Sequence, residues 1–169
     1  MVELRWLERA DAEAYRGVRL AALVDAPRAF GATYEAEAAL DLSVFEERLE
    51  RSVVLGAWVG TALVGTVFLR REERPKEVHK ATLGGFYVAP SWRRQGIADG
   101  LLAAVIQAAR GEVEQILLTV TQGNNAAIAL YERSGFVTYG VEPRACRDDD
   151  GYSDKVLMVL RLDTPPPRS

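Results

Sequence analysis

The sequence predicts an α+β fold, a three-layer sandwich in which about four helices flank a mixed, mostly antiparallel sheet of about six to seven strands. Short apolar runs of strand length recur along the chain, and longer segments carry apolar residues at helical spacing. One strand–helix–strand segment, 78–121, predicts a parallel pair, because a crossover helix returns the chain to the same edge of the sheet. Hairpins together with one crossover therefore predict a mixed sheet.

The composition is that of a globular domain. The chain has 169 residues, 49% hydrophobic and 27% charged, which suffices for one domain with a buried core. A net charge of −3 without a long basic run argues against nucleic-acid binding. No apolar run reaches the length of a membrane span, and Met1–Arg9 carries acidic residues without a signal-type apolar core. We therefore expect neither nucleic acid nor membrane as a partner.

Cysteine and histidine each occur once. Cys146 rules out an internal disulfide and fits a reducing compartment, and we expect it to be a semi-buried packing residue. His79, at a strand entrance, is expected to be exposed, and a single histidine leaves no metal cluster. We therefore expect a cytoplasmic protein without a metal.

The N-terminal strand and helix follow from alternation and turn signals. Val2–Leu7 alternates apolar and charged side chains, which predicts a strand. Asp11 is expected to cap a helix over 12–24. Pro27 disfavours helix at the residue before it, so the helix is expected to end there.

A second helix follows an irregular segment. Ser43 and Glu46 have the spacing of a capping box, which predicts a helix through Arg51. The preceding segment Arg28–Glu35 has two aromatic side chains and a carboxylate without a regular period. We expect an irregular connection there.

Three strands are predicted in the centre of the chain. Gly60-Thr61 separates the apolar runs Val53–Val59 and Ala62–Leu69, which predicts a hairpin. Val78–Val88 is expected to pair antiparallel with the second of them. Its paired glycines, Gly84-Gly85, indicate a bulge, with or without a role in ligand binding.

The connection after this strand has the features of an anion site. Arg93 and Arg94 precede a helix that Gly96 opens, and apolar residues recur at helical spacing over Ile97–Ala109. The first helical N–H groups have no partner inside the helix, and the macrodipole places partial positive charge there. Because Gly96 lacks a Cβ, a phosphate could approach the backbone. An ordinary turn with surface arginines is the alternative.

The C-terminal third predicts three strands and one helix. Glu114–Thr121 is an apolar strand, expected to lie parallel to Val78–Val88. Asn124 or Asn125 is expected to cap a helix over 126–134, which Gly135 ends. The remaining segments are strands at Val137–Gly140 and Lys155–Leu162, a solvated acidic turn at Asp148–Gly151 and a frayed tail at Thr164–Ser169.

Two of these segments resemble motifs of the GNAT (GCN5-related) N-acetyltransferase family. The RxxGxA sequence beginning at Arg93, between a strand and a helix, is similar to motif A, (Q/R)xxGx(G/A). Asn124–Phe136 closely matches motif B, NxxAxxLYxxxGF, in which Asn124 and Tyr131 project from one helix face. The resemblance covers most of the chain and is strongest over Leu83–Phe136.

The resemblance implies a single GNAT domain over 1–163, splayed between the fourth and fifth strands to admit the pantetheine arm of acetyl-CoA. It implies an enzyme that transfers the acetyl group to a primary amine of a small-molecule or peptide acceptor by direct attack in a ternary complex. A homodimer is implied by resemblance alone. The residues expected to hold acetyl-CoA are Phe86, Tyr87, Val88, Arg93, Arg94, Gln95, Gly96, Ile97, Ala98 and Asn124.

Tyr131 is the expected general acid. A phenol with a pKa near about 10 stays protonated at neutral pH and can donate to a leaving thiolate; a core aromatic is the alternative. The Val88 N–H is expected to stabilise the oxyanion. The base is open, because Thr119 stands where some family members carry a glutamate. The candidates are Glu35, Glu37, Tyr152, Asp154 and a water chain.

The resemblance also implies an acceptor side formed by Phe30, Tyr34 and Glu35, with Glu37 near them. The alternative places both aromatics in the core and both glutamates in solvent. Two alternative functions remain: a non-catalytic acyl-CoA-binding or sensor module of the same fold, and a purely structural α+β domain that binds no CoA.

Overall fold

The structure, a computed structural model, describes residues 1–163, and the tail expected at Thr164–Ser169 lies outside them. The described residues form two compact units. The first comprises Met1–Arg70 and Gly84–Val105, and the second comprises Arg71–Leu83 and the residues from Ile106 onward. In this part of the chain seven strands hydrogen-bond in the order β1 (Val2–Trp6), β2 (Val53–Val59), β3 (Ala62–Arg71), β4 (Lys80–Val88), β5 (Gln115–Thr121), β7 (Gly151–Arg161) and β6 (Val137–Asp148). This order confirms the expected mixed sheet.

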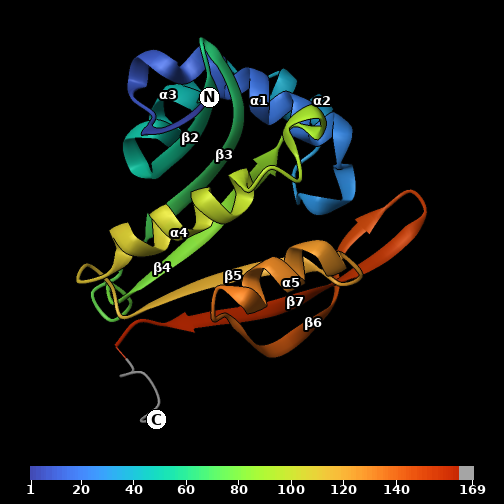
Figure 1. Cartoon of the computed structure of the whole chain (residues 1–169). Helices are drawn as coiled ribbons and strands as arrows, with labels where there is room; N and C mark the ends of the chain where they lie inside the picture. The colour runs from blue at the N-terminus through green and yellow to red at the C-terminus, as the bar shows by residue number, and fades with distance from the viewer. Residues whose placement is uncertain (164–169) are drawn as a thin grey trace. The chain divides into compact units, whose positions relative to one another are not determined.

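The first unit combines an antiparallel sheet with helices (Figure 1). β1 pairs with β2 and β2 with β3, and Gly60 turns the expected hairpin at a φ of +59°, which glycine adopts readily. The elements are β1 (Val2–Trp6), α1 (Ala12–Asp25), α2 (Tyr34–Ala38), α3 (Leu42–Arg51), β2 (Val53–Val59) and β3 (Ala62–Arg71), with 3-10 turns at Arg9–Asp11, Pro27–Ala29 and Pro90–Trp92.

Helices α1 and α3 supply the core of the first unit. Tyr15 and Phe45 meet edge to face with ring centroids 6.2 Å apart, and Phe45 is fully buried. Trp58 of β2 joins the same cluster. One helical turn after Tyr15, Val18 packs in a second cluster with Tyr87. Burial of each such side chain contributes roughly 1.5–3 kcal/mol, which holds the helices on the sheet.

Strand β4 (Lys80–Val88) and helix α4 (Ile97–Ala109) contribute residues to both units. The irregularity expected in β4 is present, because Gly85 has a φ of +59°. Phe68 of β3 packs directly over the two glycines: a Cβ at Gly84 would lie 2.5 Å from Phe68 Cζ, and one at Gly85 would lie 2.8 Å from Phe68 Cδ1. The glycine pair therefore has a packing reason as well as a conformational one.

The second unit continues the sheet with β5 (Gln115–Thr121), β6 (Val137–Asp148) and β7 (Gly151–Arg161), and with helix α5 (Asn125–Arg133). β4 and β5 pair in parallel over Lys80–Thr82, as the crossover predicts. β7 pairs antiparallel with both β5 and β6. Figure 1 shows α5 over these strands, and a Cβ at Gly135 would lie 3.1 Å from Leu160 of β7.

The expected caps of the first helices are wrong in detail. Asp41 caps α3, because its side chain accepts a hydrogen bond from the Leu42 N–H at 3.0 Å. Ser43 therefore does not cap the helix, and Glu46 pairs with Arg9 at 2.9 Å instead of closing a capping box. The helix therefore begins with the cap two positions before the expected one.

Asp11 precedes α1 as expected, but its side chain makes no cap hydrogen bond to that helix. Its carboxylate accepts from Arg5 at 3.0 Å and from the Glu8 N–H at 2.7 Å, which closes the preceding 3-10 turn. Arg5 holds the pKa of Asp11 below its usual value, against the opposing effect of burial.

Two segments are more regular than expected. The connection predicted as irregular contains the short helix α2, whose N-cap Thr33 accepts a hydrogen bond from the Ala36 N–H. The last hairpin is longer than expected, since β6 runs to Asp148 and the acidic segment forms its tip. Arg144, at a φ of +51°, lies where the register between β6 and β7 shifts.

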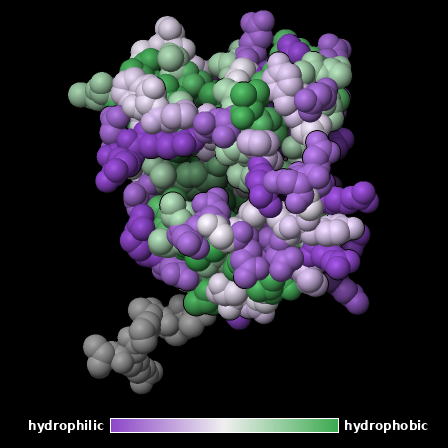
Figure 2. Space-filling view, turned by 90° about the vertical axis from the view of Figure 1, so that its right-hand side faces the viewer, coloured by the Kyte–Doolittle hydropathy of each residue, from purple (hydrophilic) through white to green (hydrophobic). Residues whose placement is uncertain are grey.

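On the face shown in Figure 2, hydrophilic residues cover much of the surface and hydrophobic ones are interspersed. Cys146 is half-buried, as expected. Among residues 1–163, no helix combines the length and the apolar composition that a membrane crossing requires.

Candidate functional site

The loop before α4 has the backbone of an anion site. Arg94 and Gly96 both adopt positive φ, at +61° and +80°. The first α4 hydrogen bond runs from the Gly100 N–H to the Gly96 carbonyl, so the N–H groups at Ile97–Asp99 precede the helical pattern. A Cβ at Gly96 would meet no atom within 4 Å, which leaves open space beside these donors. Left-handed backbone at Arg94 costs about 1–3 kcal/mol and is typical of ligand-binding segments.

The Arg93 side chain braces this loop. Its Nε donates to the Val88 carbonyl at 2.8 Å, its terminal nitrogen pairs with Asp25 at the end of α1, and the guanidinium lies 5.6 Å from the Tyr87 ring centroid. The Gln95 amide donates to the Ser91 carbonyl at 3.3 Å. These contacts tie the loop to β4 and α1, so the backbone is held in place by its own side chains.

The end of β4 is tightly packed. Tyr87 and Val88 are buried, and Phe86 is half-buried. The Ala89 N–H donates to the Val64 carbonyl at 2.8 Å, and a Cβ at Gly65 would lie 3.1 Å from the Tyr87 carbonyl. This strand end, Phe86–Val88, is therefore fixed in position directly before the α4 loop.

Helix α5 positions the two motif residues of the second unit. Asn124 is its N-cap and accepts the Ala127 N–H at 3.3 Å, which decides between the two expected caps. Tyr131 is 7% exposed and packs edge to face on Phe136, with centroids 5.8 Å apart. Burial raises the pKa of Tyr131 to about 12, so the phenol is protonated at neutral pH.

The expected acceptor residues lie on and before α2, and they differ in exposure. Phe30 is half-buried and its ring lies 4.9 Å from the Arg19 guanidinium. Tyr34 and Glu35 are exposed in the first turn of α2. Glu37 is 4% exposed and is paired with arginines, so of the alternatives for this segment a solvated Glu37 is wrong.

The remaining base candidates lie on β7. Tyr152 is 53% exposed and stacks with Arg144 at 4.8 Å. The Asp154 carboxylate accepts the Arg144 N–H at 2.8 Å and so holds the irregular backbone of β6. Thr119 is exposed on β5.

A cavity in the first unit was not expected from the sequence. It has a volume of about 170 Å³ and lies between α1, α2, α3 and β3. Its charged lining residues lie far apart in the chain, so no local sequence motif predicts the cavity. The side chains that give it its character are Tyr15, Arg19, Glu37, Arg48, Phe68 and Arg70.

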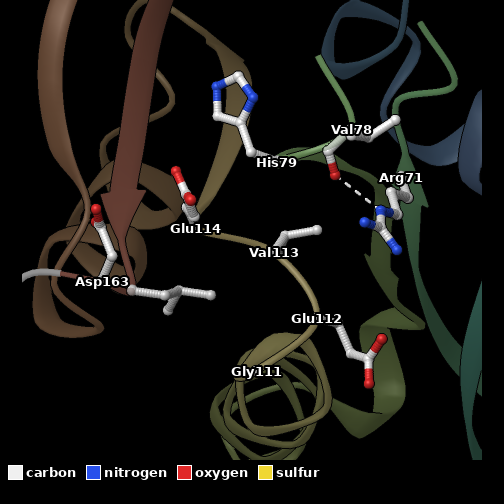
Figure 3. Close-up of a pocket in the computed structure, with 9 residues that line it drawn as sticks. Arg71, Val78, His79, Gly111, Glu112, Val113, Glu114 and Asp163 are labelled. Atoms are coloured by element: carbon white, nitrogen blue, oxygen red, sulfur yellow. Dashed lines mark hydrogen bonds between the residues drawn. The ribbon is translucent and has the colours of Figure 1, made fainter. Parts of the chain in front are cut away.

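A larger cavity of about 470 Å³ lies in the second unit (Figure 3). Arg71 Nε donates to the Val78 carbonyl at 2.7 Å beside it, and the carboxylates of Glu112 and Asp163 lie on opposite sides. His79, expected to be exposed, is half-buried here. Within residues 1–163, no group of three or more histidine, cysteine or acidic side chains is arranged to hold a metal ion.

The profile of the acetyltransferase (GNAT) family matches residues 13–136. The chain belongs to this family. The match includes β4, the α4 loop and α5, which carry the two sequence motifs. Membership supports the comparison of these elements with those of family members.

The GNAT relatives include several N-acetyltransferases. The [ribosomal protein bS18]-alanine N-acetyltransferase of Escherichia coli is 35% identical over 84 residues, which are 49% of this chain and 57% of that protein. The chain thus spans little more than half the length of this curated relative. The crystal structure of the ribosomal-protein-alanine N-acetyltransferase from Brucella melitensis is 26% identical, with a TM-score of 0.82 over 95% of this GNAT chain and 99% of that one.

A second structure, that of yncA, a putative acetyltransferase from Salmonella typhimurium with its cofactor acetyl-CoA, has a TM-score of 0.81 at 19% identity. It covers 100% of this GNAT chain and 98% of that one. At this identity the likeness shows the fold alone. The expected fold class is confirmed, since the sheet order and the neighbours are those of GNAT proteins.

Proposed function

We propose that this GNAT protein transfers the acetyl group of acetyl-CoA to a primary amine of a small-molecule or peptide acceptor. The observation that carries the proposal is the α4 loop, with left-handed backbone at Arg94 and Gly96, donors at the helix start and open space beside Gly96. When bound, acetyl-CoA supplies an activated thioester. The residues that would hold it are Phe86–Val88, the loop Arg93–Ala98 and Asn124.

The loop is suited to hold a diphosphate through backbone donors. Arg93 is turned to Asp25 and the Val88 carbonyl, so its role in the proposal is to fix the loop. Arg94 is exposed at the same loop and contributes positive charge. Hydrogen bonds to charged groups contribute roughly 1.5–3 kcal/mol each, so a few backbone donors can sustain binding of micromolar strength.

Tyr131 is proposed to donate to the departing thiolate. Its pKa of about 12 is three to four units above that of a cysteine-type thiol, about 8.5, so complete proton transfer is uphill. The phenol therefore acts chiefly as a hydrogen-bond donor to the developing negative charge. The acceptor amine must arrive neutral or lose a proton. Glu37 is unsuited to receive this proton. Burial raises the pKa of its carboxyl, but the hydrogen bonds from Arg19 and Arg48 outweigh burial, so the pKa lies below its usual value.

We also propose that the two units together form the single catalytic domain expected from the sequence, and the continuous family match over 13–136 supports this. The cytoplasmic location expected from the single cysteine and the homodimer implied by family resemblance stay predictions.

The test is thiol release from acetyl-CoA in the presence of a panel of primary amines. We expect turnover with at least one amine and a fall of roughly 10- to 100-fold in kcat for Tyr131→Phe, with little change in acetyl-CoA affinity. Tyr139→Phe, an exposed tyrosine on β6, is the matched control and should behave as wild type. Tight acetyl-CoA binding without thiol release for any amine would instead favour the non-catalytic module.

A further inference from the structure

We infer that the arginine-lined cavity of the first unit receives a carboxylate of the acceptor, so that the amine substrate carries an anionic group. This inference rests on the proposed acetyl transfer and names the substrate class. The cavity is lined by three arginines, Arg19, Arg48 and Arg70, and by one carboxylate, Glu37, which pairs with the first two. Three positive charges against one negative leave its lining with a net charge of +2. A ligand with one negative charge is therefore attracted to the cavity, and its charge does not exceed the positive charge of the lining.

Glu37 holds Arg19 and Arg48 in place but uses only some of their N–H donors. Its Oε2 accepts from Arg19 Nε and from Arg48 at 3.1 Å each, and its Oε1 accepts from the terminal nitrogen of Arg19 at 3.2 Å. A guanidinium carries five N–H donors, so both arginines retain donors beyond these bonds. Arg48 also stacks on Phe45 at 5.0 Å. The two guanidinium groups are thus held before a ligand arrives, which lowers the cost of binding.

Arg70 supplies the third charge from β3. Its side chain is exposed and makes no ion pair or hydrogen bond with any other residue of the described part of the chain. Phe68 lies two positions earlier on the same face of the strand, so both reach the cavity. An arginine without a partner at the rim of a cavity with fixed arginines is the arrangement that captures a planar carboxylate.

The neutral lining and the size narrow the class of ligand. Tyr15 and Ser52 bring hydroxyl groups, and burial raises the pKa of the Tyr15 phenol, so it adds no negative charge at neutral pH. The cavity volume of about 170 Å³ is smaller than the roughly 300–1,000 Å³ typical of pockets that hold drug-sized ligands. The cavity therefore fits a carboxylate with a short stem, as in an amino acid or an acidic side chain near a peptide N-terminus.

The cavity adjoins the strand expected to hold the pantetheine arm. Phe68 lines the cavity on one side and packs on Gly84 and Gly85 on the other. Thr66, on the same strand face, donates to the Gly85 carbonyl at 3.3 Å. One side chain thus separates the arginines from the β4 irregularity, all within the first unit.

The experiment compares acceptors that differ only in charge. Free amino acids are assayed against their carboxamides, and C-terminally amidated peptides with Asp or Glu at the second position are assayed against the Asn and Gln versions. We expect kcat/KM to favour the carboxylate form by about 10- to 100-fold in one of the two series, which identifies the source of the carboxylate. Arg70→Gln should remove most of this preference while leaving the carboxamides within about twofold of wild type. Arg70→Lys should restore part of it.

Arg51→Gln is the matched control, because Arg51 is an exposed arginine at the end of α3 that does not line the cavity. Equal rates for acid and amide in both series would overturn the inference while leaving acetyl transfer intact. So would a preference that survives Arg70→Gln. If no amine is acetylated, the proposed function fails, and calorimetric titration of the same acids and amides into wild type and Arg70→Gln decides the cavity alone. Arg70-dependent binding of the acid would support it, and its lack would overturn it.

Discussion

At the scale of single residues, Tyr131 combines two properties that the sequence could not separate. It is buried against Phe136, as a core aromatic would be, and its burial keeps the phenol protonated, as a hydrogen-bond donor requires. A seven-residue spacing from Asn124 indicated a shared helix face but not the degree of burial. Packing and chemistry are therefore compatible in this side chain.

The raised pKa of Tyr131 predicts a specific loss of stability at high pH. Below about pH 10 the phenol is neutral in both states, and between the unfolded pKa of 10.0 and the folded pKa of about 12 the unfolded chain ionises first. Stability therefore falls as pH rises through this window, by roughly 2–3 kcal/mol for a shift of about two units. Urea titrations from about pH 8 to about pH 11 should show Tyr131→Phe losing less stability than wild type.

Burial also raises the pKa of Tyr15, which lowers stability at high pH in both proteins, so the difference between wild type and Tyr131→Phe isolates Tyr131. Tyr139→Phe should follow the wild-type curve. Parallel curves for wild type and Tyr131→Phe would show that the phenol is not kept neutral by the fold.

The ion-pair partners of Glu37 and Asp25 could not be predicted from the sequence. The local backbone at the motif residues of α5 and of the α4 loop could be predicted, because the Asn124 cap and the glycine before α4 depend on neighbours a few positions away. The pairing of Glu37 with Arg19 and Arg48 joins α2 to α1 and α3, and Arg93 reaches Asp25 across 68 positions. Such partners depend on tertiary packing, which periodicity does not encode.

At the scale of elements, the start of α4 was predictable and its bracing was not. A glycine before an amphipathic stripe predicts both the helix start and the phosphate-compatible backbone. The same local logic found the β2–β3 hairpin and α5. It failed for α2, because this short helix has too few residues to show an apolar period, although its cap is local. It also failed for the full length of β6, because residues on both faces of the strand are exposed and no alternation of apolar and polar side chains is visible.

The α4 loop yields a prediction about Gly96. Gly96→Glu should abolish acetyl-CoA binding, because a side chain and a negative charge would fill the space beside the helix donors. Gly111→Glu, after the other end of α4, has the same open surroundings and a φ of +83° against +80°. Both variants pay a similar strain of about 1 kcal/mol, so their thermal stabilities should fall alike. Calorimetric titration should show lost acetyl-CoA affinity only for Gly96→Glu. Undiminished affinity in that variant would refute the assignment of the α4 loop as the diphosphate site.

At the scale of the whole molecule, the chain path links the two units through regular elements. The chain passes between them at Arg70/Arg71, Leu83/Gly84 and Val105/Ile106, and these points fall inside β3, β4 and α4. Domain boundaries ordinarily fall in exposed linkers. Neither unit can therefore be excised without cutting hydrogen-bonded backbone. The sequence predicted one domain on other grounds, because 169 residues suffice for a single buried core.

This path predicts a single cooperative unfolding transition. If one unit melted alone, the parts of β4 and α4 that it contributes would lose their hydrogen bonds and destabilise the parts left in the other unit. In scanning calorimetry we expect one peak with equal calorimetric and van't Hoff enthalpies. Tryptophan fluorescence should give the same midpoint as far-ultraviolet circular dichroism, because Trp6, Trp58 and Trp92 all lie in the first unit while dichroism reports both. Saturating acetyl-CoA should raise both midpoints together. A fluorescence transition separated from the dichroism transition would show that the units unfold independently despite their shared elements.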